Sequence, residues 1–214
     1  YKLIGNVYGE FDFGTVSKAL EGLVFRSSFG GEYAIVNTDT YTPEYFLDAM
    51  HFSVIDKAYK GLDMYSRWNF ENVLTYTKSF GVHNLTLMAG SAAFKDMYEN
   101  LWGAKNDLIF DDFGHSYLDN ATDPESANAG GGYSEHTVAS LFARVNYDLM
   151  DRYMLTATIR RDGSSRFGDE NKYGYFPSAS VGWVISREDF MSNLSHIFNT
   201  LKLRASWGQN GNES

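Results

Sequence analysis

The chain has 214 residues, with 18 Lys and Arg against 27 Asp and Glu, and 16% of its residues are aromatic. It has no Cys, which excludes a disulfide framework and a thiolate metal site, and its acidic balance disfavours a nucleic-acid partner because net negative charge repels phosphate. No run approaches the roughly 18 consecutive apolar residues of a membrane-spanning helix, whereas a strand of a membrane β-barrel needs only about 10 alternating residues.

Apolar and polar residues alternate with a period of two in a series of similar segments, which predicts β-strands. The clearest case places Leu141 and Val145 on one side of a strand and Arg144 on the other. Eight such segments follow one another along the chain, at 3–13, 23–29, 68–77, 85–90, 139–149, 155–160, 178–186 and 201–207. We therefore expect an all-β fold of about eight antiparallel strands.

The predicted links between these strands differ in length in a regular way. The shorter links lie at 14–22, 81–83, 151–152 and 187–200, and the longer ones at 37–66, 95–137 and 163–175. Short links on one rim and long links on the other are typical of an outer-membrane barrel, with short periplasmic turns and long external loops. Aromatic residues near strand ends, such as Trp68, Tyr153 and Trp207, are also expected of the interfacial girdles of such a barrel.

A second interpretation stays open at this point. An antiparallel soluble sheet with one solvated face shows the same alternation, so the chain could be a soluble β-sandwich that acts as a carbohydrate-binding or adhesin-like module. The two interpretations differ in a simple property, because a soluble module would stay monodisperse without detergent.

A family resemblance rests on specific motifs. Residues 161–168 read RDGSSRFG, 171–178 read NKYGYFPS, and GW follows at 182–183. Together they closely resemble the C-terminal half of the barrel of SusC/RagA-type TonB-dependent outer-membrane transporters. The segment LKLRASWGQNGN at 201–212 matches the next strand of that family, and FRSSFG at 25–30 and HNLTLMAG at 83–90 fit more loosely.

The resemblance implies an antiparallel up-and-down transmembrane β-barrel segment, about eight strands of a 22-stranded barrel in the outer membrane of a Gram-negative cell of the Bacteroidetes type. It implies an N-terminal plug, energy from TonB, a SusD-like surface lipoprotein as lid, and an oligosaccharide or sometimes a peptide as cargo. Neither a plug nor a TonB box is recognised in these residues and both ends look cut. We therefore expect residues 1–214 to be part of the barrel domain of a longer protein.

Lipid is the remaining expected partner of the segment. The face that would contact it carries the larger apolar side chains of the C-terminal strands. These are Leu141, Val145, Ile159, Val181, Trp183 and Leu203.

The motif at 161–168 combines Gly, Ser and Arg, as phosphate-binding loops do. However, no helical pattern follows it, and it lacks the Lys-Ser/Thr pair of such loops. We expect a structural role instead, in which the arginines pair with carboxylates such as Asp162 or Asp169 and the glycines permit turns. The residues with this expected role are Arg161, Asp162, Gly163, Ser164, Ser165, Arg166, Phe167 and Gly168.

No pattern in the sequence points to an enzyme. There is no Gly-x-Ser-x-Gly elbow and no cysteine nucleophile, the five His are dispersed, and the acidic stretch at 111–125 lacks the order of an EF-hand. We expect no catalytic, cofactor or metal site.

Cargo binding is the remaining candidate activity. Sugars usually stack on flat aromatic rings, and the long links offer Tyr98, Trp102 and Tyr117 as candidate substrate-binding residues. Packing of the loops against each other explains these residues equally well. A short amphipathic helix over 48–63 is also predicted, from the spacing of Ala49, Phe52 and Ile55.

Overall fold

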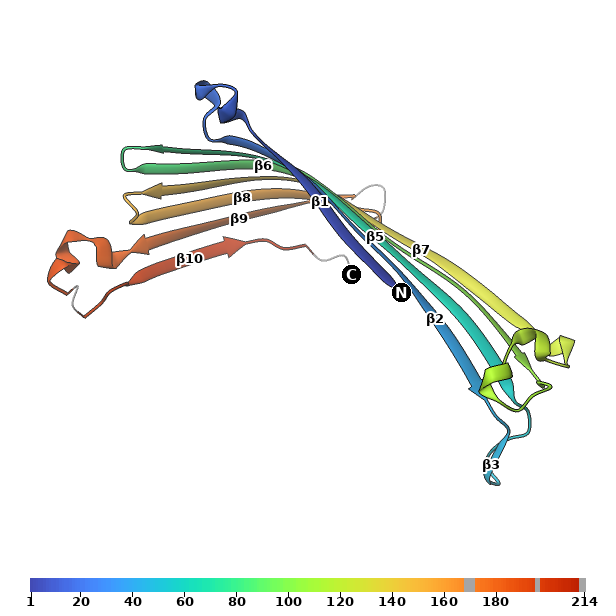
Figure 1. Ribbon diagram of the computed structural model, residues 1–214. Coiled ribbons are helices and arrows are strands. Elements are labelled where there is room, and N and C mark those ends of the chain that lie inside the picture. The colour runs from blue at the N-terminus through green and yellow to red at the C-terminus, as the bar shows by residue number, and fades with distance from the viewer. Residues whose placement is uncertain (168–171, 195–196, 212–214) are drawn as a thin grey trace. The chain divides into compact units, whose positions relative to one another are not determined.

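The computed structural model describes residues 1–167, 172–194 and 197–211. Over these residues, eight strands form one sheet in the order β1-β2-β5-β6-β7-β8-β9-β10, and β3 pairs only with β4 in a small hairpin (Figure 1). Each strand of the large sheet thus lies beside the strand that precedes it in the sheet's chain order, which is an up-and-down meander. The eight strands are β1 (Lys2–Asp12), β2 (Leu23–Thr42), β5 (Lys57–Phe80), β6 (His83–Asn106), β7 (Asn128–Leu149), β8 (Tyr153–Ser164), β9 (Tyr173–Val184) and β10 (Lys202–Gly208).

The remaining elements are short. The hairpin consists of β3 (Tyr45–Asp48) and β4 (His51–Ser53). Short 3-10 helices lie in the links, at η1 (Phe13–Thr15), η2 (Lys18–Leu20), η3 (Phe113–His115), η4 (Leu118–Asn120), η5 (Pro124–Ser126), η7 (Ile185–Arg187) and η8 (Asp189–Leu194). No helix in the described part of the chain is long and apolar enough to cross a membrane.

The chain divides into two compact units, which are described separately below. Unit 1 comprises residues 1–5, 31–67 and 96–135, and unit 2 comprises residues 6–30, 68–95 and 136–214.

The prediction of eight strands in an all-β meander is confirmed, but six of the strands, β2 and β5 to β9, are longer than predicted. Most of the expected long links at 37–66 and 95–137 is strand, and the connections that remain are 43–56 and 107–127. The extensions were missed because they mix aromatic and charged residues on their faces, so they give no contrast between an apolar and a polar side.

The predicted helix over 48–63 is wrong. Its first part belongs to the β3–β4 hairpin and its last part to β5. The carboxylate of Asp48 closes the hairpin turn, since its Oδ1 accepts hydrogen bonds from the backbone N–H of Met50 (2.8 Å) and of His51 (2.9 Å). An Asp side chain that bonds nearby backbone in this way competes with helix formation.

Within unit 2, the pairing of β7 to β10 fixes which side chains share a face. Leu141 pairs with Arg161 and Arg161 with Tyr175, whereas Arg144 pairs with Thr158 and Thr158 with Ser178. Directly paired residues of an antiparallel sheet point to the same side, so one face is largely apolar and the other polar. The apolar face includes Tyr147, Tyr153, Leu155, Ile159, Val181, Trp183, Leu203 and Trp207.

The apolar face is not covered by other parts of the described chain. Leu141 is 56% exposed, Ile159 52% and Leu203 60%. Buried apolar residues are few over the same residues: Ala58, Ala104, Leu108, Val184 and Met191. A soluble β-sandwich would bury such a face against a second sheet, so this architecture argues against the soluble alternative.

The tight turn between β7 and β8 carries backbone strain. Met150 and Asp151 both have positive φ, at 57° and 54°, and the Arg152 N–H donates to the Leu149 carbonyl (3.0 Å). This is the geometry of a type I′ hairpin turn, which favours Gly and Asn because other L-residues pay roughly 1–2 kcal/mol in the left-handed region.

We predict that Met150→Gly in the full-length protein raises the apparent unfolding temperature, with a gain of about 0.5–1 kcal/mol after the entropic cost of Gly. The matched control is Val16→Gly, in another link of unit 2, because Val16 is exposed with φ of −93°. That change should destabilise by about 0.5–1 kcal/mol. Equal shifts of the same sign in heat-dependent gel migration would contradict the prediction.

Candidate functional site

The motif at 161–167 joins the end of β8 to its neighbours. The Thr137 N–H donates to Ser165 Oγ (2.9 Å), and the Ser165 N–H donates to the Thr137 carbonyl (2.9 Å). Ser164 is buried, its Oγ lies 3.2 Å from His136 Nε2, and it accepts from the Arg166 N–H (3.2 Å). These contacts tie the first part of the motif to β7. Gly168 and Asp169 lie outside the described residues.

The arginines of this segment face opposite ways. Arg160, rather than Arg161, pairs with Asp162: its Nε lies 2.7 Å from both carboxylate oxygens, and its Nη2 donates to Ser140 Oγ (2.9 Å). Arg161 instead lies over the ring of Tyr173, 3.9 Å from its centre. Side chains alternate along a strand, so residues 160 and 162 share a face that residue 161 cannot reach. The expected pairing of Arg161 with Asp162 is therefore wrong.

Unit 1 brings two of the three candidate binding residues together with aromatic partners. Trp102 on β6 stacks with Tyr59 on β5, with ring centres 6.0 Å apart and planes inclined at 21°. Tyr98, four residues before Trp102, lies 5.0 Å from the ring of Tyr65 and donates a 2.6 Å hydrogen bond to Asp63. We call these five residues the aromatic face.

Glycine and charged residues surround the aromatic face. A Cβ at Gly130 on β7 would lie 2.9 Å from the Trp102 indole, so only glycine fits beneath this ring without displacing it. Further along the same two strands, Arg67 Nε lies 3.1 Å from Asp96 Oδ1. Flat rings beside carboxylates and a guanidinium suit a polyhydroxylated ligand, whose apolar faces stack while its hydroxyls bond to the charged groups.

Tyr117 does not join the aromatic face. Its ring lies 5.3 Å from Lys60 Nζ, and Lys60 follows Tyr59 in β5, so these two strand side chains point to opposite faces. The neighbouring Leu118 packs on Gly103, where a Cβ would lie 3.0 Å from its Cδ1, and Gly103 likewise alternates with Trp102. The sequence pattern does not single out Tyr59, Asp63 and Tyr65, because it predicts a link over 37–66. Aromatic and acidic residues at every second position there were the available signal.

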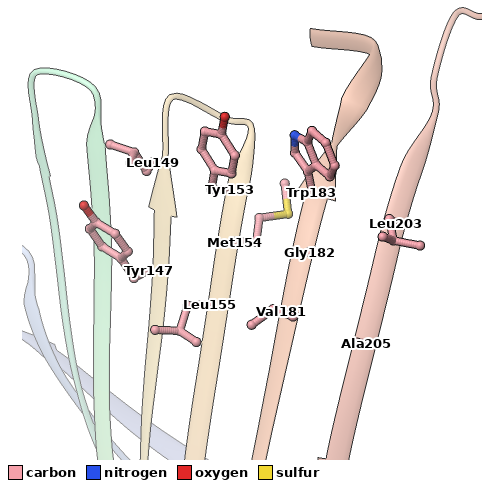
Figure 2. Close-up of a pocket in the computed structure, with 10 residues that line it drawn as sticks. All are labelled: Tyr147, Leu149, Tyr153, Met154, Leu155, Val181, Gly182, Trp183, Leu203 and Ala205. Carbon is pink, nitrogen blue, oxygen red and sulfur yellow. The ribbon is translucent and has the colours of Figure 1, made fainter. Parts of the chain in front are cut away.

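A second cluster lies in unit 2, at the start of β8 and the end of β9, near the short turns. Glu188 Oε1 accepts hydrogen bonds from the Tyr153 hydroxyl (2.5 Å) and the Trp183 indole N–H (2.8 Å), and Arg152 Nη1 lies 3.3 Å from its Oε2. Figure 2 shows the polar atoms of both rings towards the turn end of the strands. The rings border an apolar cavity of about 580 Å³ on the exposed face.

This environment stabilises the ionised form of the Glu188 carboxyl. The hydrogen bond from Tyr153 lowers the pKa of Glu188 most, and the bond from Trp183 and the charge of Arg152 lower it further, below the ordinary value of 4.5.

These features define a class of protein. An up-and-down antiparallel meander with one exposed apolar face, and with aromatic residues at both ends of that face, is the architecture of an outer-membrane β-barrel segment. The chain matches the family described as "TonB dependent receptor-like, beta-barrel" over residues 5–212, and it belongs to this family.

Its relatives agree with this assignment. The chain is 32% identical over 200 residues to TonB-dependent receptor P39 of Formosa agariphila, covering 92% of this chain and 18% of the relative. It is 29% identical over 213 residues to TonB-dependent receptor SusC of Bacteroides thetaiotaomicron, covering 99% of this chain and 20% of the relative. The chain thus spans about a fifth of the length of these relatives.

A solved structure shows the same fold. The chain superimposes on a structure of the RagAB peptide transporter with a TM-score of 0.79 at 20% identity, over 99% of this chain and 23% of the other. The resemblance to SusC/RagA-type receptors that the motifs predict is therefore confirmed.

We predict that the Glu188 cluster comes apart only in acid. Since the folded-state pKa lies below the unfolded value of 4.5, its stabilisation is present above pH 4.5 and is lost as the pH falls through the lower folded value. The measurement is the fluorescence of Trp183, taken as the difference between the full-length protein and its Trp183→Phe variant. Glu188→Gln, which cannot ionise, should show no such transition. A fluorescence transition with its midpoint above pH 4.5 would contradict this prediction.

Proposed function

We propose that the chain is part of a transporter that imports a nutrient across the outer membrane with energy from TonB. The observation that carries this proposal is the exposed apolar face of unit 2, together with membership of the TonB-dependent receptor family. The proposed partners are outer-membrane lipid, TonB and a SusD-like surface lipoprotein that closes over the cargo. No chemical reaction is proposed, and the chain's role is binding and translocation.

The dimensions of the apolar face support a membrane position. Tyr153 pairs with Trp183 near one end of β8, and Gly163 pairs with Tyr173 near the other. The ten steps from residue 153 to residue 163 span about 33 Å along the strand at about 3.3 Å each. At a strand tilt of about 40°, this corresponds to about 25 Å across the membrane, which is the height of the apolar band of outer-membrane barrels.

The edges of the sheet support a larger assembly. Over the described residues, β1 and β10 are the two outer strands of the sheet. Unpaired backbone groups cost several kcal/mol each in hydrocarbon, so we propose that these eight strands work within a larger closed barrel.

We predict that spin labels at Ala143 and Arg144 report different surroundings in the full-length protein. Residue 143 shares the face of Ile159, its partner in the register, and residue 144 shares the face of Thr158. The label at 143 should be accessible to oxygen dissolved in lipid and the label at 144 to a water-soluble relaxation agent. Equal water accessibility at both positions would contradict the lipid-facing assignment.

For the cargo, we propose an oligosaccharide that binds at the aromatic face of unit 1. The stacked rings of Tyr59 and Trp102 and the neighbouring carboxylate of Asp63 are the groups that pyranose rings and hydroxyls require. A peptide is the second candidate, because RagAB, whose structure has a similar fold, is a peptide transporter.

The test uses the intact gene. We predict that its deletion abolishes growth on the cargo glycan and that the wild-type gene restores it. Trp102→Ala should restore growth only at about tenfold higher glycan concentration, because a lost aromatic contact is worth about 1.4 kcal/mol. Trp207→Ala, on the apolar face of unit 2, is the matched control and should behave as wild type. Uptake unaffected by the deletion would refute the transport function, and equal effects of the two variants would refute the aromatic face.

A further inference from the structure

One cation of unit 2 lies on the apolar face. In the register of β7, β8 and β9, Arg161 stands in a row between Leu141 and Tyr175. The adjacent row consists of Ala139, Gly163 and Tyr173. An arginine on a surface that faces lipid is costly unless its guanidinium meets a partner.

Aromatic rings hold Arg161, and no carboxylate does so within the described residues. Its guanidinium carbon lies 3.9 Å from the centre of the Tyr173 ring and 5.8 Å from that of Tyr175. Its Nε is buried and has no hydrogen-bond partner over the same residues. The nearest carboxylate in sequence, that of Asp162, is bound by Arg160 on the other face. Over the described residues, aromatic rings therefore position the charge of Arg161 and no carboxylate pairs with it.

A groove adjoins Tyr173, whose ring holds Arg161. It has a volume of about 350 Å³, and the small residues Ala139 and Gly163 are part of its lining. The Tyr173 ring leans across Gly163, where a Cβ would lie 2.5 Å from the ring, so the glycine makes room for the ring that supports Arg161. The lining also includes Trp68, Ala93, Ser165 and Lys172.

We propose that Arg161, Tyr173 and this groove bind a phosphorylated lipid of the outer leaflet. The row of Arg161 lies next to the long link between β8 and β9, on the rim where outer-membrane barrels carry their external loops. Arg binds phosphate through paired N–H groups while its flat face stacks on an aromatic ring, and the groove suits an acyl chain. The inference rests on the proposed membrane position of the apolar face.

The experiment uses the full-length protein in maltoside detergent, titrated with an acylated glucosamine disaccharide phosphate and with the same lipid after phosphatase treatment. Native mass spectrometry gives both affinities. We expect the phosphorylated lipid to bind about tenfold more tightly. Arg161→Gln should abolish this preference, and Tyr173→Leu should reduce it. The matched control is Arg144→Gln, since Arg144 lies on the polar face and donates to Thr158.

Each outcome is decisive. A phosphate preference that is absent in the wild type, or unchanged in Arg161→Gln, overturns the site, as does equal binding of a phosphate ester without acyl chains. If Arg161→Gln does not fold, as judged by heat-dependent gel migration, Tyr173→Leu decides. Growth on the cargo should be unchanged in these variants, so failure here leaves the transport function standing. A water-exposed label at Ala143 would instead overturn the membrane position itself.

Discussion

Backbone hydrogen bonding between neighbouring strands is the interaction on which this molecule depends. In most domains a packed core shares that task, but here the buried apolar residues of the described chain are few and mostly small. The ladder holds the sheet together while both faces stay open to their surroundings. Such a sheet is stable where the apolar face is covered by something other than the chain itself, and in the proposed membrane position hydrocarbon would supply that cover.

Because side chains alternate strictly between the two faces of a strand, one strand places neighbouring residues in two different environments. On β8, Arg160 and Arg161 are neighbours in sequence but have different surroundings. Arg160 is bound to Asp162 and Ser140, and Arg161 lies over the ring of Tyr173 on the apolar face. The same separation on β6 places Trp102 on the aromatic face and Gly103 beneath Leu118. A one-residue slip of register would exchange these environments, so the pairing is strongly specified.

The sequence predicts the strands wherever one face is apolar, and it fails where neither face is. Segments such as 139–149 and 155–160 show the contrast because one side meets lipid in the proposed arrangement. The strand extensions at 57–66 and 95–106 carry tyrosine, tryptophan and carboxylates, so periodicity in hydrophobicity vanishes although the ladder continues. Residue type alone singled out Tyr98 and Trp102. Their partners Tyr59 and Asp63 required knowledge of the strand register, and the path of Tyr117 through its loop follows no period.

The polar and charged groups at the two ends of the apolar face find their partners in different ways. At the end near the short turns, Tyr153 and Trp183 direct their polar atoms to Glu188, which Arg152 also contacts. Every polar group there finds a partner within the chain. At the other end, Tyr173 and Tyr175 flank Arg161, whose charge finds no carboxylate over the described residues. The two leaflets of an outer membrane differ in the groups they present. An end of the apolar face whose polar groups are all bonded within the chain needs no bonding partner from its leaflet. An end that leaves a cation uncompensated is stable only where the leaflet supplies an anion, which is why we assign the lipid phosphate to Arg161 and not to Arg152.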